Sequence, residues 1–332
     1  MPFLARKTRG IDAALIAEPE GPAAIRSQAQ PDRLFRPNLL GRCANPGCRS
    51  GWIHLFRKRS TPVFEGGWTC SPECTEARIR CALQRELDGR TPSLEVHRHR
   101  IPLGLLMLQQ GWISREQLRK ALDAQKSAGA GRLGDWLIRQ HATDEAAVTR
   151  ALGIQWSCPV LSVESGAPSS LAAVMPRLFL DAFGALPLRV AAGKLLYLGF
   201  EECPDPALAF AVERMMGLRV ECGIVQSSAF RVAHAHVLNE SFPPVQLGEA
   251  VSASAAAHML SRAIERSQPV TSHLLRVHDC IWLRMFLAHD ETPVPRIESV
   301  RDVVCSIEDI QVSNALKHSW LWPITQLEKA KE

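Results

Sequence analysis

The sequence of 332 residues contains no run of 18 or more apolar residues, so we expect no membrane-spanning helix. The first stretch, MPFLARKTRGIDAALIAEPEG, has charged residues where a signal peptide needs an apolar segment, and secretion is therefore not expected. A cytoplasmic location is the resulting expectation. The ten cysteines would then be thiols or metal ligands rather than a disulfide framework.

Catalytic signatures are also missing. The P-loop pattern G-x-x-x-x-G-K-[ST] does not occur, and GAGRLGDW has the glycines but neither the lysine nor the hydroxyl residue. We find no nucleophile, base and oxyanion set, and no paired carboxylates in a suitable loop. His234 and His236 supply only two metal ligands, which make a weak site. We therefore expect a protein that is not an enzyme.

Positive charge is concentrated in the first third of the chain. Residues 1–100 contain 17 Lys and Arg against 10 Asp and Glu, whereas the remainder contains 22 against 24. A basic segment of this kind attracts nucleic acid or another anionic partner, and WIHLFRKR combines basic with aromatic residues. The alternative is a basic tail that is merely solvated. Residues 1–36 lack hydrophobic periodicity, which predicts a disordered basic tail.

Four cysteines form two close pairs, Cys43-x4-Cys48 and Cys70-x3-Cys74, separated by 21 residues. Two such pairs suit a tetrahedral Zn²⁺ ion, because each pair can bind one side of the metal. The insert can form a β-hairpin, and the second pair falls at a helix start, where thiolate is favoured. The pattern predicts a small treble-clef-like zinc finger over 37–90 with a structural ion. The alternative is a set of buried free cysteines.

A 24-residue segment occurs twice, at 102–125 (PLGLLMLQQGWISREQLRKALDAQ) and at 132–155 (RLGDWLIRQHATDEAAVTRALGIQ). Each copy predicts a short helix, a turn and a second helix, because apolar residues recur at helical spacing. Ser114 and Asp144 are the expected N-caps of the second helices, and Gln117 completes a capping box in the first copy. The duplication therefore predicts two equivalent helical hairpins.

Short strands alternate with helices after the repeats. Over 156–232 we expect strands at CPVLSV, on both sides of the Gly193-Lys194 turn and at LRVECGIV, with helices at SSLAAVMPRLFLDAFG and DPALAFAVERMMG. Residues 233–332 predict a small α+β region of unknown role, with a helix in GEAVSASAAAHMLSRAIERSQ and strands in HLLRVHDCIWLRMFLA and VRDVVCSI. The expected fold class is α+β multidomain, with 91–101 as a linker before the repeats.

The duplicated motif and the segments after it, CPVLSV, MPRLFL, ALPLRVAAGKLLYLGFEECPDP and VECGIV, resemble the MshEN domain. This is the N-terminal domain of type II secretion and type IV pilus assembly ATPases. The resemblance implies a domain over 102–232, with the duplicated helical motif at 102–155 and an α/β half at 156–232. Many members bind cyclic di-GMP through the motif, which begins Arg-Leu-Gly and ends Leu-x-x-Gln. The P-loop of the ATPase motor does not occur in this sequence.

When the family motif is matched to this sequence position by position, the resemblance implies a ligand site shared by both copies. The motif positions that are retained are Arg132, Leu133, Gly134, Leu137, Leu152 and Gln155 in the second copy, and Leu103, Gly104, Gly111, Leu118, Leu122 and Gln125 in the first. A cyclic dinucleotide has pseudo-twofold symmetry, so each copy offers a half-site. Arginine can stack on guanine or bond phosphate, glycine at a helix start admits close backbone approach, leucines pack on purine faces, and glutamine supplies hydrogen bonds.

Two positions depart from the family pattern. Pro102 stands where the first copy should have arginine, and His141 stands where the second copy should have glycine. Arg100 lies two residues before Pro102, but proline fixes the local backbone. Loss of one cationic contact of ~1.5–3 kcal/mol weakens binding by one to two decades without abolishing it. Cyclic di-GMP binding and a repeat that serves only helix packing are both open interpretations.

The sequence thus predicts a non-catalytic cytoplasmic module with a zinc finger, an MshEN-type domain and a C-terminal α+β region. Its expected role is protein association that responds to cyclic di-GMP, with a protein partner from a secretion or pilus-type machine. Two alternatives remain. One is nucleic-acid binding through the basic finger, which would weaken steeply with salt, and the other is a docking scaffold that needs no cyclic di-GMP.

Overall fold

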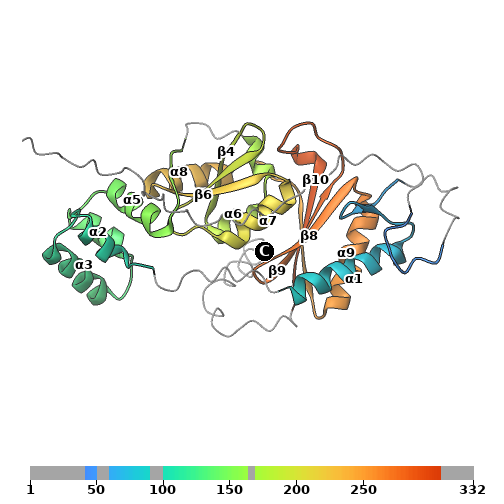
Figure 1. Cartoon of the computed structure of the whole chain (residues 1–332), viewed down its shortest axis with the longest axis horizontal. Helices are drawn as coiled ribbons and strands as arrows, with labels where there is room; N and C mark the ends of the chain where they lie inside the picture. Colours follow the sequence, from blue (N-terminus) through green and yellow to red (C-terminus); the bar gives the residue numbers. More distant parts are fainter. Residues whose placement is uncertain (1–41, 51–59, 90–99, 164–168, 308–332) are drawn as a thin grey trace, which may run out of the picture. The chain divides into compact units, whose positions relative to one another are not determined.

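The computed structural model of the chain describes residues 42–50, 60–89, 100–163 and 169–307. The predicted basic tail, the WIHLFRKR segment, most of the predicted linker and the last 25 residues of the C-terminal region lie outside the described residues. Within the described part, helices combine with two four-stranded sheets and one two-stranded hairpin (Figure 1). No helix in that part is long and apolar enough to cross a membrane.

The two copies of the repeat fold as two helical hairpins with matching boundaries. Their helices, in chain order, are α2 (Leu103–Gln109), α3 (Arg115–Ala128), α4 (Leu133–Arg139) and α5 (Glu145–Trp156). Ser114 accepts a hydrogen bond from Gln117 N at 3.2 Å, and Asp144 accepts one from Ala147 N at 2.6 Å. Gln117 also completes the capping box. These contacts confirm both predicted caps and fix where the second helix of each copy begins.

A four-stranded sheet follows the repeats. Its elements are β3 (Val160–Leu161), η2 (Ser169–Ala173), α6 (Arg177–Phe183), β4 (Ala185–Ala191), β5 (Leu195–Phe200), α7 (Pro206–Met216), β6 (Arg219–Val225) and α8 (Ser227–Leu238). The strand order is β3-β6-β5-β4, with β4 and β5 antiparallel around the predicted turn and the other pairs parallel. The stretch SSLAAVMPRLFLDAFG, expected as one helix, is divided before Pro176, which has no N–H for a continuous helix.

Residues 245–307 contain a second mixed sheet and one long helix. The elements are β7 (Val245–Ala250), α9 (Ala253–Ser267), β8 (Thr271–Val277), β9 (Cys280–Phe286), η3 (Ile297–Ser299) and β10 (Val300–Ile307). The strand order is β7-β10-β9-β8, and β7 is parallel to β10 while the other pairs are antiparallel. The helix expected from Gly248 begins only at Ala253, because Ser252 caps it and the residues before it join β7.

The cysteine-rich segment shares a hydrophobic core with this C-terminal sheet. The segment contributes β1 (Val63–Phe64), β2 (Gly67–Trp68) and α1 (Pro72–Asp88). Figure 1 shows α1 beside α9, and Ile79 and Leu83 of α1 are buried in one cluster with Leu260 and Ile264 of α9. The two helices therefore bury their apolar faces against each other and against one face of the sheet.

Hydrogen bonds reinforce this packing between parts of the chain that are far apart in sequence. Val63 N donates to the carbonyl of Pro269 at 3.0 Å, which places β1 against the start of β8. The Ser272 hydroxyl donates to the carbonyl of Val63 at 2.8 Å, inside the protein. On the helices, Thr75 Oγ1 donates to Glu265 at 2.6 Å. Removing α1 would leave the core of the C-terminal sheet open on this side.

The opposite face of the C-terminal sheet packs on the α/β half. Trp282 of β9 lies in one core with residues of α6 and α7. Beside it, Arg284 and Asp302 form an ion pair with both side chains fully buried, and Arg284 also donates to the carbonyls of Ala173 and Val174. A buried ion pair is tolerated when its hydrogen bonds are satisfied, and these bonds reach from the sheet into the α/β half.

Candidate functional site

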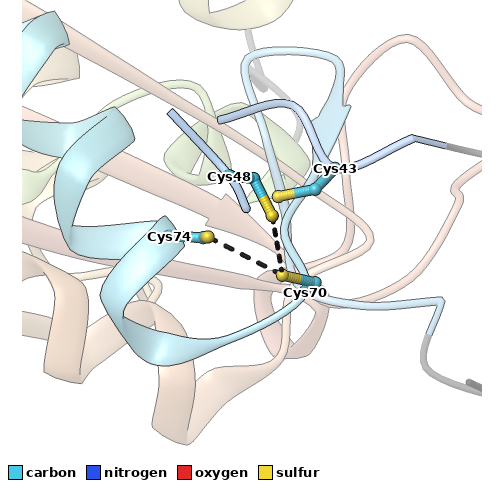
Figure 2. Close-up of side chains that lie close together, drawn as sticks. All are labelled: Cys43, Cys48, Cys70 and Cys74. Carbon is cyan, nitrogen blue, oxygen red and sulfur yellow. Dashed lines mark hydrogen bonds between the residues drawn. The ribbon is translucent and has the colours of Figure 1, made fainter. Parts of the chain in front are cut away.

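The four cysteines predicted as metal ligands come together from a loop, a strand end and a helix (Figure 2). Cys43 and Cys48 lie in the loop before β1, Cys70 follows β2, and Cys74 lies in the first turn of α1. Ser71 caps α1 by accepting a hydrogen bond from Cys74 N at 3.4 Å. The cap fixes the helical turn that carries the last of the four thiols.

The four Sγ atoms all lie within 4.8 Å of one another. The Sγ atom of Cys70 is 3.6 Å from those of Cys48 and Cys74. In a tetrahedral site with Zn–S bonds of about 2.3 Å, neighbouring sulfur atoms are about 3.8 Å apart. The four cysteines are therefore close enough to bind a metal ion, and the two separations of 3.6 Å are near the value for a tetrahedral site.

Burial keeps the thiols of the cluster neutral when no cation is bound. Burial and the neighbouring thiols raise the pKa of Cys70 to about 12, and burial also raises the pKa of Cys43. Four thiolates this close together would repel one another, and a cation among them offsets that repulsion. Metal binding here would therefore release protons.

The glutamines that end the two copies of the repeat make reciprocal hydrogen bonds. Gln125 Nε2 donates to the carbonyl of Gly131 at 2.8 Å, and Gln155 Nε2 donates to the carbonyl of Ile101 at 2.7 Å. Gly131 and Ile101 are the residues directly before the first position of the second and first copies. Each copy therefore ends in a glutamine that bonds the residue just before the start of the other copy.

The two motif glycines also pack reciprocally. A Cβ atom at Gly104 would lie 2.6 Å from Leu118 of its own copy and 3.0 Å from Leu133 of the other. A Cβ atom at Gly134 would lie 2.9 Å from Val148, the residue equivalent to Leu118. Close packing of the helices therefore favours glycine at both positions, independently of any contact with a ligand.

The predicted leucines divide between the core of the repeat and its surface. Leu137 is fully buried, and four others are partly buried against the same core: Leu103, Leu118, Leu133 and Leu152. Leu122 is 45% exposed. Two apolar residues close to the reciprocal glutamine contacts, Ile101 and Ile154, are also exposed. Helix packing accounts for the partly buried leucines, whereas Leu122 is available at the surface.

Arg132, the predicted cationic residue, is the N-cap of α4, and its side chain meets three carboxylates. Its Nε is 3.0 Å from Asp135 and its Nη2 is 3.2 Å from Glu201, while Nη1 pairs with Glu202. Partial burial lowers the pKa of Arg132, but the bonds to Asp135 and Glu201 outweigh burial, and the net pKa lies above its ordinary value. All three guanidinium nitrogens are therefore engaged within the protein.

Glu201 and Glu202 belong to an acidic loop after β5 to which sequence reasoning gave no role. Glu201 accepts hydrogen bonds from the Ser227 hydroxyl and from Arg231 Nη2, the latter at 2.9 Å. Burial raises the pKa of Glu201, but bonds from Ser227 and Arg132 outweigh burial, so the net pKa lies below its ordinary value. The pair of acidic residues at the end of a predicted strand was visible in the sequence, but no neighbouring residue indicates that the pair contacts Arg132.

Pro102 and Arg100 mark the difference between the two copies. Pro102 has φ −55° and ψ 139°, close to the extended φ −94° and ψ 146° of its equivalent Arg132. The guanidinium of Arg100 lies over the ring of Trp156, 3.1 Å from its centroid. A cavity of about 370 Å³ adjoins this pair and is also lined by Phe210. Arg100 is therefore held at the end of α5.

Gly111 and His141 occupy equivalent turns between the two helices of each copy. Their φ angles are 71° and 53°, both in the left-handed region. Their N–H groups make equivalent bonds, from Gly111 to the carbonyl of Leu108 at 3.1 Å and from His141 to that of Ile138 at 2.9 Å. The second copy thus keeps the backbone of the turn with a residue for which that conformation is strained.

Searches of protein-family models and of curated proteins give no match for this chain. Among solved structures, a structure of MshE with cdg, an abbreviation for cyclic di-GMP, is similar with 26% sequence identity and a TM-score of 0.33, covering 42% of this chain and 99% of that one. The N-terminal domain of XpsE is similar with 17% identity and a TM-score of 0.27, covering 40% and 91%.

Proposed function

We propose that the chain is a non-catalytic module that binds cyclic di-GMP at the duplicated repeat. The observation that carries the proposal is the reciprocal closure of the two copies, in which Gln125 and Gln155 each bond to the start of the other copy. A ligand with two like halves fits a site built from two like halves. The resemblance of the motif to MshEN domains supplies the identity of the ligand.

Arg132 is the residue proposed to stack on guanine or bond a phosphate of the ligand. The first copy has Pro102 at the equivalent position, so one half-site contributes one cation fewer. We expect binding one to two decades weaker than with both arginines, since a charged contact contributes about 1.5–3 kcal/mol. Exposed Leu122 supplies an apolar contact for a purine face.

We also propose that the four-cysteine cluster holds a structural zinc ion. Zinc is supported by the all-thiolate donor set and by sulfur separations of 3.6 Å. Four protein ligands leave no open coordination position, so the bound ion would stabilise the fold and supply no catalytic chemistry. Because α1 packs on α9, the ion would also stabilise the helical layer over the C-terminal sheet. The treble-clef-like arrangement stays a prediction.

The proposed biological role is cytoplasmic protein association under the control of the ligand. The resemblance of the repeat to a domain of secretion and pilus assembly ATPases favours a partner from such a machine. The sequence contains no P-loop pattern, which favours a regulatory or adaptor role over a motor role. A scaffold that ignores the ligand would bind the same partner equally well with and without cyclic di-GMP.

Calorimetric titration of the full chain with cyclic di-GMP tests the ligand. Arg132→Ala is expected to weaken binding at least tenfold, the equivalent of about one charged contact. Arg139→Ala removes a charge from the same helix and should change the affinity less than about twofold. Absence of heat from folded wild-type protein with ligand near ~100 μM, a weak-binding limit, would contradict the proposal.

A further inference from the structure

We propose that the acidic loop at Glu201 and Glu202 competes with an anionic ligand for Arg132. The inference rests on the proposed function, because it takes Arg132 as the residue that meets a phosphate. Nε, Nη1 and Nη2 of this arginine are paired with Asp135, Glu202 and Glu201, respectively. A phosphate needs one edge of the guanidinium fork, so at least one of these carboxylates must leave before it binds.

The three carboxylates are held to different degrees. Asp135 lies on the same helix as Arg132 and stays beside it in any position of the loop. Glu201 is mostly buried and is also held by Ser227 and Arg231. Glu202 is 51% exposed, so its pairing with Arg132 is screened by water and is the easiest to break. Glu202 is therefore the first competitor that a ligand displaces.

The competition has a consequence for how the repeat contacts the α/β half. Arg132 and Glu201 are 69 residues apart and join these two regions at the acidic loop. A separate contact joins them at Glu145 of α5, which accepts from Ser228 N at 2.5 Å and from Gln226 Nε2 at 2.9 Å. A ligand that takes Arg132 would open the contact at the loop and leave the contact at Glu145. Ligand binding is thereby coupled to release of the acidic loop.

The same carboxylates favour charged ligands over neutral ones. When a carboxylate leaves Arg132, a phosphate can replace its negative charge beside the guanidinium. A neutral ligand such as guanosine supplies no such charge. Neutralising Glu202 should therefore strengthen binding of cyclic di-GMP. It should give guanosine no comparable advantage.

The test uses the full chain as wild type, Glu202→Gln, and Glu201→Gln combined with Glu202→Gln. We expect the dissociation constant for cyclic di-GMP to fall about two- to fivefold in the single variant, as for a half-exposed ion pair, and about tenfold in the double variant. Glu221→Gln removes the same charge from an exposed position on β6 and serves as the matched control. Circular dichroism checks that each variant is folded.

Hydrogen exchange gives a readout of the contact at Glu145. The amide of Ser228, which donates to Glu145, should stay protected in wild type with and without cyclic di-GMP.

Each outcome decides the matter. Tighter binding in both variants, with Glu221→Gln unchanged, supports the competition. Equal affinity in wild type and both variants overturns the competition and leaves the proposed function intact. An equal gain in Glu221→Gln also overturns it, because the effect is then one of general charge. No binding to any of these proteins overturns the competition and the proposed function together.

Discussion

Exchanging residue types at the two equivalent turns of the repeat should change its stability in opposite directions. His141 and Gly111 both have φ in the left-handed region, but only glycine adopts it without strain. We therefore expect His141→Gly to stabilise the second copy and Gly111→Ala to destabilise the first. His141→Asn is the control, because asparagine tolerates positive φ and removes the imidazole ring.

The expected size follows from two opposing contributions. A left-handed conformation costs a residue with a Cβ atom about 1–2 kcal/mol. Glycine also stabilises the unfolded chain by about 0.4–1 kcal/mol through its conformational entropy, and this offsets part of the stability gained by relieving the strain. The net effect is about 0.5–1 kcal/mol, stabilising for His141→Gly and destabilising for Gly111→Ala.

Native-state hydrogen exchange measures the effect at matched amides. Ala142 N donates to the carbonyl of Leu137 at 2.9 Å in the second copy, and Trp112 N donates to that of Met107 at 3.0 Å in the first. In His141→Gly, protection of the Ala142 amide should rise about two- to fivefold. In Gly111→Ala, protection of the Trp112 amide should fall by a similar factor. Reduced protection in His141→Gly would refute the reasoning.

Three further predictions concern the metal, pH and the first half-site. Chelating the metal should speed hydrogen exchange in α1 and α9 but not in α3, measured by mass spectrometry with zinc restored as the control. His278 Nε2 donates a hydrogen bond to Asp205 that raises the pKa of His278; burial raises the pKa of Asp205, but the same bond outweighs burial, so the net pKa of Asp205 is lowered. Their 2.7 Å contact should therefore stabilise the fold at about pH 5–6 and lose its effect as pH rises through the raised histidine pKa. The difference in stability between wild type and His278→Asn should accordingly be larger at about pH 5–6 than above the raised histidine pKa, and a difference that does not change with pH would contradict the pairing. Pro102→Arg should tighten cyclic di-GMP binding about tenfold, and unchanged calorimetric affinity would contradict a two-arginine site.

The features that sequence predicted well are those with local causes. Ser114 and Asp144 cap their helices through contacts three residues away, so spacing alone identifies them. The reciprocal arrangement of the copies follows in outline from their duplication. The cysteine pairs come together because each pair is already close in sequence, and the hairpin and α1 bring one pair to the other.

The features that sequence did not predict depend on distant partners. The contact of Thr75 with Glu265 spans 190 residues, and no pattern near either residue indicates that α1 packs on α9. The engagement of Arg132 by the acidic loop is similarly non-local. Strand β7 was missed because its register is set by the parallel neighbour β10, whereas its own residues alternate only weakly between buried and exposed positions.

Stoichiometry tests most directly whether the two copies of the repeat form one ligand site. Calorimetric titration of the full chain with cyclic di-GMP should give one ligand per chain, with affinity weakened at least about tenfold by Arg132→Ala. Two independent ligands per chain would contradict a shared site, and absence of binding by both wild type and Glu202→Gln would contradict the proposed ligand.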